Sequence, residues 1–164
     1  MAETDNRPGE GDVFPDLDLT LPDGGTVKAS DYRGGKLVVF FYPKDDTPGC
    51  TTENKDFSAL KEAFGKAGAA VLGVSKDPPA RHAKFAAKHA LAVPLASDTA
   101  PDSGEAGVAE ALGIWVEKSM YGRSYMGMER TTYLVDGEGV IRRVWRKVKV
   151  KGHAAEVLAA AEAL

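Results

Sequence analysis

The chain has 164 residues, of which 43% are hydrophobic, and this length and composition suit one globular domain with a sizeable core. A formal net charge of −3 argues against general binding to nucleic acids or membrane surfaces, and no apolar run approaches the roughly 20 residues that span a bilayer. The one cysteine, Cys50, excludes an internal disulfide and favours a reducing compartment, so we expect a cytoplasmic protein.

The polar amino terminus predicts a flexible tail over residues 1–10, followed by a single domain over residues 11–164. The tail has no apolar core segment of the kind found in signal peptides or membrane anchors. Residues 16–21 alternate between polar and apolar side chains, and residues 22–25 have the composition of a turn. With a returning strand at 26–28, this segment predicts an amino-terminal β-hairpin.

Residues 37–42 are continuously apolar, aromatic or β-branched, which is typical of a strand buried on both faces of a sheet. After a polar turn, Thr47 followed by Pro48 predicts a helix start, with the Thr47 hydroxyl accepting a hydrogen bond from a first-turn N–H. Cys50 then falls in the first turn, where free N–H groups and the helix dipole stabilise a thiolate. We therefore interpret Cys50 as functional, since a merely buried cysteine would be expected within an apolar strand.

The rest of the chain alternates between strand and helix patterns. Helices are predicted from residue 47 to about 67 and over 77–89, 105–112 and 153–164, and strands over 69–75, 93–96, 131–135 and 140–144. Residues 113–128 predict a long irregular or edge segment. A strand-helix-strand-helix-strand half followed by two strands and a helix is the plan of the thioredoxin fold. We predict an α/β protein of this thioredoxin-like type, with a central mixed β-sheet flanked by helices and the amino-terminal hairpin as an extension.

Several charged residues have a structural interpretation. Asp45 and Asp46 are expected to point outward from a solvated turn, because negative charges facing the thiol would oppose its ionisation. His82, His89 and His153 are widely spaced and are expected to be surface or structural residues, so we predict no metal. The basic run at 142–151 is expected to be a solvated edge strand. No glycine-rich phosphate loop follows a predicted strand, so we predict no cofactor.

The segment around Cys50 resembles the active-site motif of the peroxiredoxins. It reads Phe41-Tyr42-Pro43-Lys44-Asp45-Asp46-Thr47-Pro48-Gly49-Cys50-Thr51. The similarity also takes in residues 121–136 and 143–148 and covers the chain from about residue 11 onward. In particular, the chain resembles the subfamily called peroxiredoxin Q or bacterioferritin comigratory protein, in the AhpC/TSA group of the thioredoxin-like superfamily.

The resemblance implies a thiol-dependent peroxidase, an antioxidant oxidoreductase that acts on hydrogen peroxide and organic hydroperoxides and takes part in cell redox homeostasis. Matching positions make Cys50 the peroxidatic nucleophile, Thr47 the hydroxyl that orients peroxide, Pro43 a lid against water and Arg130 the cationic partner. The chemistry needs these residue types, because the thiolate attacks one peroxide oxygen while the departing oxygen gains charge. The hydroxyl, the first-turn N–H groups and the guanidinium can donate hydrogen bonds to that oxygen, and arginine keeps its charge throughout.

The chain departs from the subfamily in one respect. Members often carry a second, resolving cysteine, at the position of Lys55 or at that of Ala86, and neither residue is cysteine here. The sulfenic acid at Cys50 is therefore expected to be reduced by an external thiol such as thioredoxin, glutaredoxin or glutathione. We expect a monomer, with a weak dimer as the alternative.

Two other functions remain as alternatives. A thiol-disulfide oxidoreductase on the same fold normally needs a Cys-x-x-Cys pair, and Thr47 and Glu53 occupy the two positions that could complete one. A non-catalytic module could instead use the thioredoxin-like surface to bind a partner. Consumption of peroxide in the presence of a small thiol distinguishes these possibilities.

Overall fold

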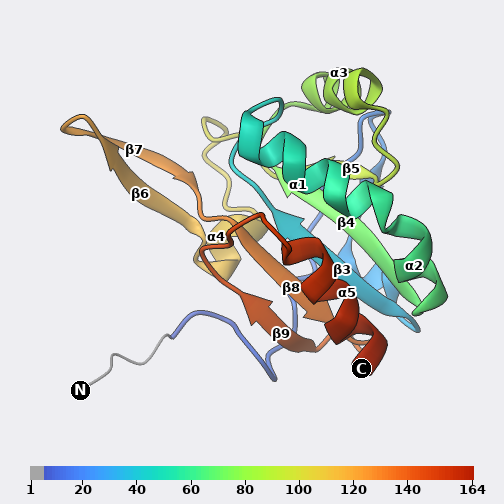
Figure 1. Ribbon diagram of the computed structural model, residues 1–164. Helices are drawn as coiled ribbons and strands as arrows, with labels where there is room; N and C mark the ends of the chain where they lie inside the picture. Colours follow the sequence, from blue (N-terminus) through green and yellow to red (C-terminus); the bar gives the residue numbers. More distant parts are fainter. Residues whose placement is uncertain (1–5) are drawn as a thin grey trace.

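The structure is a computed structural model that describes residues 6–164, and within them a seven-stranded mixed sheet carries the fold (Figure 1). The strands stand in the order β2-β1-β5-β4-β3-β8-β9. Their bounds are β1 (Leu19–Thr20), β2 (Thr26–Val27), β3 (Lys36–Phe41), β4 (Ala69–Ser75), β5 (Leu95–Ser97), β8 (Thr131–Val135) and β9 (Ile141–Trp145). Strands β3, β4 and β5 run parallel, while β1, β2, β8 and β9 pair antiparallel with their neighbours. The predicted mixed sheet and amino-terminal hairpin are confirmed.

Helices cover both faces of this sheet. They are the 3-10 helix η1 (Ala29–Tyr32) and the α-helices α1 (Pro48–Ala59), α2 (Lys61–Lys66), α3 (Pro79–His89), α4 (Val108–Leu112) and α5 (His153–Ala163). Buried side chains of α1, α2, α3 and α5 form one apolar cluster, and those of α4 belong to a second cluster. Figure 1 shows α1, α2 and α5 side by side over one face.

Strand β3 lies inside the sheet, between β4 and β8, as its apolar sequence predicts. Its side chains alternate between the two clusters: Val38 and Phe40 pack with the helices α1 and α2, whereas Val39 and Phe41 pack on the opposite face. Cys50 belongs to the first cluster. The carboxyl end of β3 therefore leads into the start of α1, where Cys50 lies.

Two regions differ from the sequence-based prediction. The helix predicted to run to residue 67 is interrupted at Leu60, whose φ of −99° and ψ of 3° separate α1 from α2. Within residues 113–128, predicted to be an irregular or edge segment, β6 (Trp115–Met120) and β7 (Arg123–Met128) form a separate antiparallel hairpin that projects from the body (Figure 1). Its two-residue turn has positive φ at both Tyr121 and Gly122, the conformation that favours tight hairpins.

Part of the predicted tail is attached to the body. Residues 1–5 lie outside the described residues, but Arg7 Nη1 lies 2.6 Å from Glu129 Oε2, and Arg146 Nη2 donates to the carbonyl of Pro8 at 3.0 Å. The described part of the chain has no helix long and apolar enough to cross a membrane.

Candidate active site

The start of α1 is built as the sequence predicts, except for its cap. Thr47 is the N-cap residue in an extended conformation, Pro48 is the first helical residue, and the N–H of Thr51 donates to the carbonyl of Thr47 at 2.8 Å. The predicted capping hydrogen bond is wrong: the Thr47 hydroxyl donates backward to the carbonyl of Lys44 at 2.8 Å. Its two lone pairs thus stay available to accept a hydrogen bond.

Cys50 lies at the third position of α1, with only 1% of its surface exposed. Arg130, from the link between β7 and β8, places Nη2 3.4 Å from the Cys50 sulfur, although the two residues are 80 positions apart. Pro48 carries no N–H, so Gly49 and Cys50 supply the first backbone N–H groups of the helix, which lack intrahelical partners. The thiol therefore lies beside a guanidinium and in the first turn of a helix whose first two N–H groups have no intrahelical partner.

Glu53 is a site residue that the sequence analysis missed. Its Oε1 lies 2.6 Å from Nη1 of Arg130, so the guanidinium contacts the carboxylate with one nitrogen and the Cys50 sulfur with the other. Burial raises the pKa of Glu53 to about 7 although Arg130 opposes this shift, and its Oε2 is buried without a hydrogen-bond partner. The spacing of three residues between Cys50 and Glu53 was the available signal, since it places both on one face of a helix.

Arg130 is held as a cation at this position. Burial acts to lower the pKa of Arg130, but the neighbouring Glu53 and Cys50 outweigh it and raise that pKa above its ordinary value. Gly49 leaves room for the guanidinium, because a Cβ at this position would stand 3.2 Å from Nη2. Lys118 of β6 is a further cation that interacts with Arg130 and Cys50. Burial lowers the pKa of Lys118, and repulsion by Arg130 lowers it further.

Pro43 is half-buried at the end of β3. It lines a cavity of about 660 Å³ together with Lys76, Asp77 and Trp115, and the lining includes neither Thr47 nor Cys50. The role of Pro43 as a lid over the thiol stays a prediction, as do the catalytic roles of Thr47, Cys50 and Arg130.

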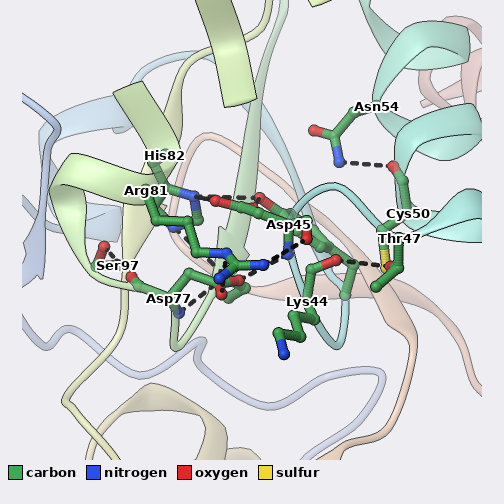
Figure 2. Close-up of polar contacts among 11 residues, drawn as sticks. Lys44, Asp45, Thr47, Cys50, Asn54, Asp77, Arg81, His82 and Ser97 are labelled. Atoms are coloured by element: carbon green, nitrogen blue, oxygen red, sulfur yellow. Dashed lines mark hydrogen bonds and ion pairs between the residues drawn. The ribbon is translucent and has the colours of Figure 1, made fainter. Parts of the chain in front are cut away.

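The two aspartates before Thr47 behave differently from one another. Asp46 is exposed, as predicted, and pairs with Lys88 and His89 of α3. The prediction for Asp45 is wrong: its side chain is fully buried, and its two carboxylate oxygens contact the Tyr42 hydroxyl and His82 (Figure 2). This burial could not be predicted from the sequence, because His82 in α3 is distant along the chain. Within residues 6–164, no group of three or more histidine, cysteine, aspartate or glutamate residues is arranged so that it could hold a metal ion.

Comparison with known proteins agrees with this geometry. The chain matches the AhpC/TSA family over residues 11–144. It is 48% identical to Peroxiredoxin Bcp of Bacillus subtilis over 148 residues, which are 90% of this chain and 91% of that protein. Identity to Peroxiredoxin Bcp of Escherichia coli is 37% over 143 residues, with 87% of this chain and 88% of that protein covered.

Solved structures of peroxiredoxins share the fold. Xanthomonas campestris Peroxiredoxin Q superposes with a TM-score of 0.81 at 48% identity over 90% of both chains. A serine-substituted PrxQ of Xylella fastidiosa gives a TM-score of 0.87 at 37% identity over 97% of this chain and 98% of that one.

The Xanthomonas protein was also solved with either of two cysteines changed to serine, and those cysteines are separated by the same number of residues as Cys50 and Ala86 here. Ala86 of α3 thus stands where that relative has a second cysteine, and this chain has one cysteine. The fold, the setting of the thiol and these matches together show that the chain belongs to the AhpC/TSA family and is a peroxiredoxin.

Proposed function

We propose that the chain reduces peroxides with Cys50 as the nucleophile. The observation that carries this proposal is the 3.4 Å contact between the buried sulfur and Nη2 of Arg130, at the amino-terminal end of a helix. A cation and the positive end of the helix dipole both favour the thiolate, which is the nucleophilic form of cysteine. Arg130 thus supports the reactive form directly.

The thiolate attacks the terminal oxygen of a hydroperoxide, and the oxygen-oxygen bond breaks as the sulfur-oxygen bond forms. Cys50 becomes a sulfenic acid, and the remaining oxygen leaves as an alkoxide, or as hydroxide when the substrate is hydrogen peroxide, and takes up a proton. Negative charge moves from the sulfur to that oxygen, so donors already present beside the sulfur stabilise the transition state. The Arg130 fork and the N–H groups of Gly49 and Cys50 are such donors.

Thr47 fits the role of orienting the peroxide before attack. Because its hydroxyl hydrogen is engaged by the carbonyl of Lys44, its oxygen is left to accept a hydrogen bond from the O–H of the substrate. This directs the terminal oxygen toward the helix start. The hydroxyl thus acts as an acceptor for the substrate, rather than as the donor to the departing oxygen that was expected from the sequence.

The sulfenic acid is recycled by an external thiol. Lys55 is exposed and Ala86 is half-buried, and since neither is cysteine, an added thiol must attack the sulfenic sulfur and release water. A second thiol then attacks the mixed disulfide and restores Cys50. Thioredoxin, glutaredoxin and glutathione supply this chemistry. A cytoplasmic monomer with one domain over residues 11–164 suits both the reducing thiol and the seven-stranded main sheet.

Peroxide consumption with a small dithiol tests the proposal. The parent should turn over, and Cys50→Ser should show no turnover while circular dichroism shows an unchanged fold, because the substitution removes a nucleophile and little volume. Substantial turnover by Cys50→Ser would contradict the assignment. Reduction of an added disulfide by the dithiol, catalysed by the parent without loss of peroxide, would favour the oxidoreductase alternative, and no reaction at all would favour a binding module.

A further inference from the structure

The burial of Cys50 creates a problem for the second half of the proposed reaction. Hydrogen peroxide is small, but a thiol reductant carries a bulky carbon skeleton and must approach the sulfur itself. With 1% of its surface exposed, Cys50 is out of reach of such a molecule. The segment around the sulfur must therefore open for reduction, and the contacts that keep it closed control that step.

The active-site loop, which we define as residues 43–47 between β3 and α1, makes its buried polar contacts with the body at Asp45, whereas the contacts of Asp46 with α3 are exposed. Its carboxylate Oδ1 accepts a hydrogen bond of 2.6 Å from the Tyr42 hydroxyl, and its Oδ2 lies 2.6 Å from Nδ1 of His82. Its backbone N–H donates to Asp77 Oδ2 at 2.8 Å, and its carbonyl accepts from Arg81 Nη2 at 3.3 Å. Oδ1, the N–H and the carbonyl of Asp45 thus have hydrogen-bond partners outside α1, whereas Oδ2 makes no hydrogen bond and only lies close to His82.

The partners of Asp45 are themselves held in place. Asp77 Oδ2 accepts a bond of 2.6 Å from the Ser75 hydroxyl, and the Ser97 hydroxyl donates to the carbonyl of Asp77, also at 2.6 Å (Figure 2). Arg81 Nε lies 3.3 Å from the other carboxylate oxygen of Asp77. Side chains of strands β4 and β5 therefore hold Asp77 in place, and Asp77 in turn holds Asp45.

The Tyr42 hydroxyl is a fixed donor in this cluster. Burial raises the pKa of Tyr42 well above its ordinary value, and the charge of Asp45 adds to the effect, so the hydroxyl keeps its proton and donates it. A buried carboxylate that is contacted by a hydroxyl and an imidazole is costly to expose or to leave unpaired, because each partner would lose its shortest polar contact, and the contacts that remain, between Tyr42 and His82 and between His82 and Ser75, are both 3.4 Å long.

We propose that Asp45 is a positioning residue, which through Tyr42, Asp77 and His82 holds the active-site loop closed and so keeps the Cys50 sulfur beside Arg130 and away from thiols. The proposal goes beyond the nucleophile, the orienting hydroxyl and the arginine. It rests on the proposed function for its effect on turnover, but the exposure of Cys50 can be measured without peroxide.

A matched pair of substitutions tests the proposal. Asp45→Asn and Asp46→Asn make the same chemical change at adjacent positions of the loop, one buried and one 38% exposed. Asn also tolerates the positive φ of 60° at residue 46. Asp45→Ala is the stronger variant, and Asp45→Asn keeps the test informative if the alanine variant fails to fold.

The first readout is the rate at which the neutral reagent iodoacetamide alkylates Cys50 in the reduced protein, over a series of urea concentrations below the unfolding transition. We expect Asp45→Ala to raise this rate about tenfold, Asp45→Asn to raise it by less, and Asp46→Asn to leave it near the parent rate. The increase should depend weakly on urea, because a local opening exposes little surface.

Three results would overturn the proposal. One is an alkylation rate in both Asp45 variants equal to that of the parent. Another is an equal increase in Asp46→Asn. The third is an increase that follows urea as steeply as global unfolding does, with amide exchange rising throughout the sheet, because that would assign Asp45 a purely stabilising role.

The second readout separates the two halves of the reaction. The closed form reacts with peroxide and the open form with thiols. If the closed form dominates in the parent, a tenfold larger open fraction in Asp45→Ala hardly lowers the single-turnover rate with peroxide. Reduction of the sulfenic acid by glutathione should instead become about tenfold faster. Equal slowing of both steps would contradict a positioning role. If the parent does not react with peroxide, the proposed function fails, and the alkylation series still decides the role of Asp45.

Discussion

Replacing Glu53 by Gln tests the most unusual electrostatic feature of the site. Glu53 is a buried carboxyl whose pKa is raised from an ordinary 4.5 to about 7 by burial, despite its contact with Arg130. The folded protein therefore holds this proton up to a higher pH than the unfolded chain does. Stability from this source is fully present below about pH 4.5 and is lost as the pH rises through about 7.

The size of the effect follows from the two pKa values. The gap between 4.5 and about 7 corresponds to about 3 kcal/mol in total, of which about 2.5 kcal/mol is lost between about pH 5 and pH 8. Gln is isosteric with the protonated carboxyl and does not titrate. The free energy of unfolding of the parent should therefore fall relative to that of Glu53→Gln by about 2.5 kcal/mol over that range.

Urea unfolding of both proteins at a series of pH values measures this difference, and every other titrating group that is unaffected by the substitution cancels in the comparison. At the acidic end we expect the two proteins to be nearly equal in stability. A difference that does not change with pH would refute the buried, proton-holding state of Glu53. A parent that gains stability relative to Glu53→Gln as the pH rises would show that the ion pair with Arg130 outweighs burial.

Three further substitutions test the peroxide step through its second-order rate constant. Thr47→Val should lower the rate constant about tenfold, because it removes the acceptor that orients the peroxide, whereas Thr52→Val, which removes an exposed hydroxyl bonded to the helix backbone, should not. Arg130→Met should lower it about a hundredfold by removing a donor to the departing oxygen, and an unchanged rate would remove the guanidinium from the mechanism. Gly49→Ala should lower the rate constant severalfold, because its Cβ would stand 3.2 Å from Nη2 of the guanidinium. Gly65→Ala should leave it unchanged, because no atom lies within 4 Å of the new Cβ. Equal effects of these two glycine changes would count against a steric origin.

Features fixed by neighbouring residues could be predicted from the sequence. Strand β3 and the start of α1 follow from an apolar run and from Thr47 and Pro48, and the structure places both within one residue of the prediction. The direction of the Thr47 hydroxyl could not be predicted, because the carbonyl of Lys44 and the first-turn N–H groups compete for it and only the loop conformation decides.

Features that depend on distant segments were predicted poorly. Asp45 looks like part of a solvated turn, and its burial depends on His82 and Asp77, which the β4–α3 unit brings to it. The contact between Arg130 and the thiol was expected only through the resemblance to the peroxiredoxins, and composition or periodicity would not have found it. Hairpin β6–β7 was missed because its strands are largely exposed and show little apolar alternation.

The most direct test of the account is intact mass spectrometry after the reduced protein has reacted with one equivalent of hydrogen peroxide. We predict a gain of one oxygen on Cys50 as the first product, its loss on addition of glutathione, and a second oxygen when peroxide is in excess, because no second thiol in the chain traps the sulfenic acid. An unchanged mass after peroxide has been consumed, or a disulfide-linked dimer as the dominant early product, would contradict a one-cysteine peroxidase centred on Cys50.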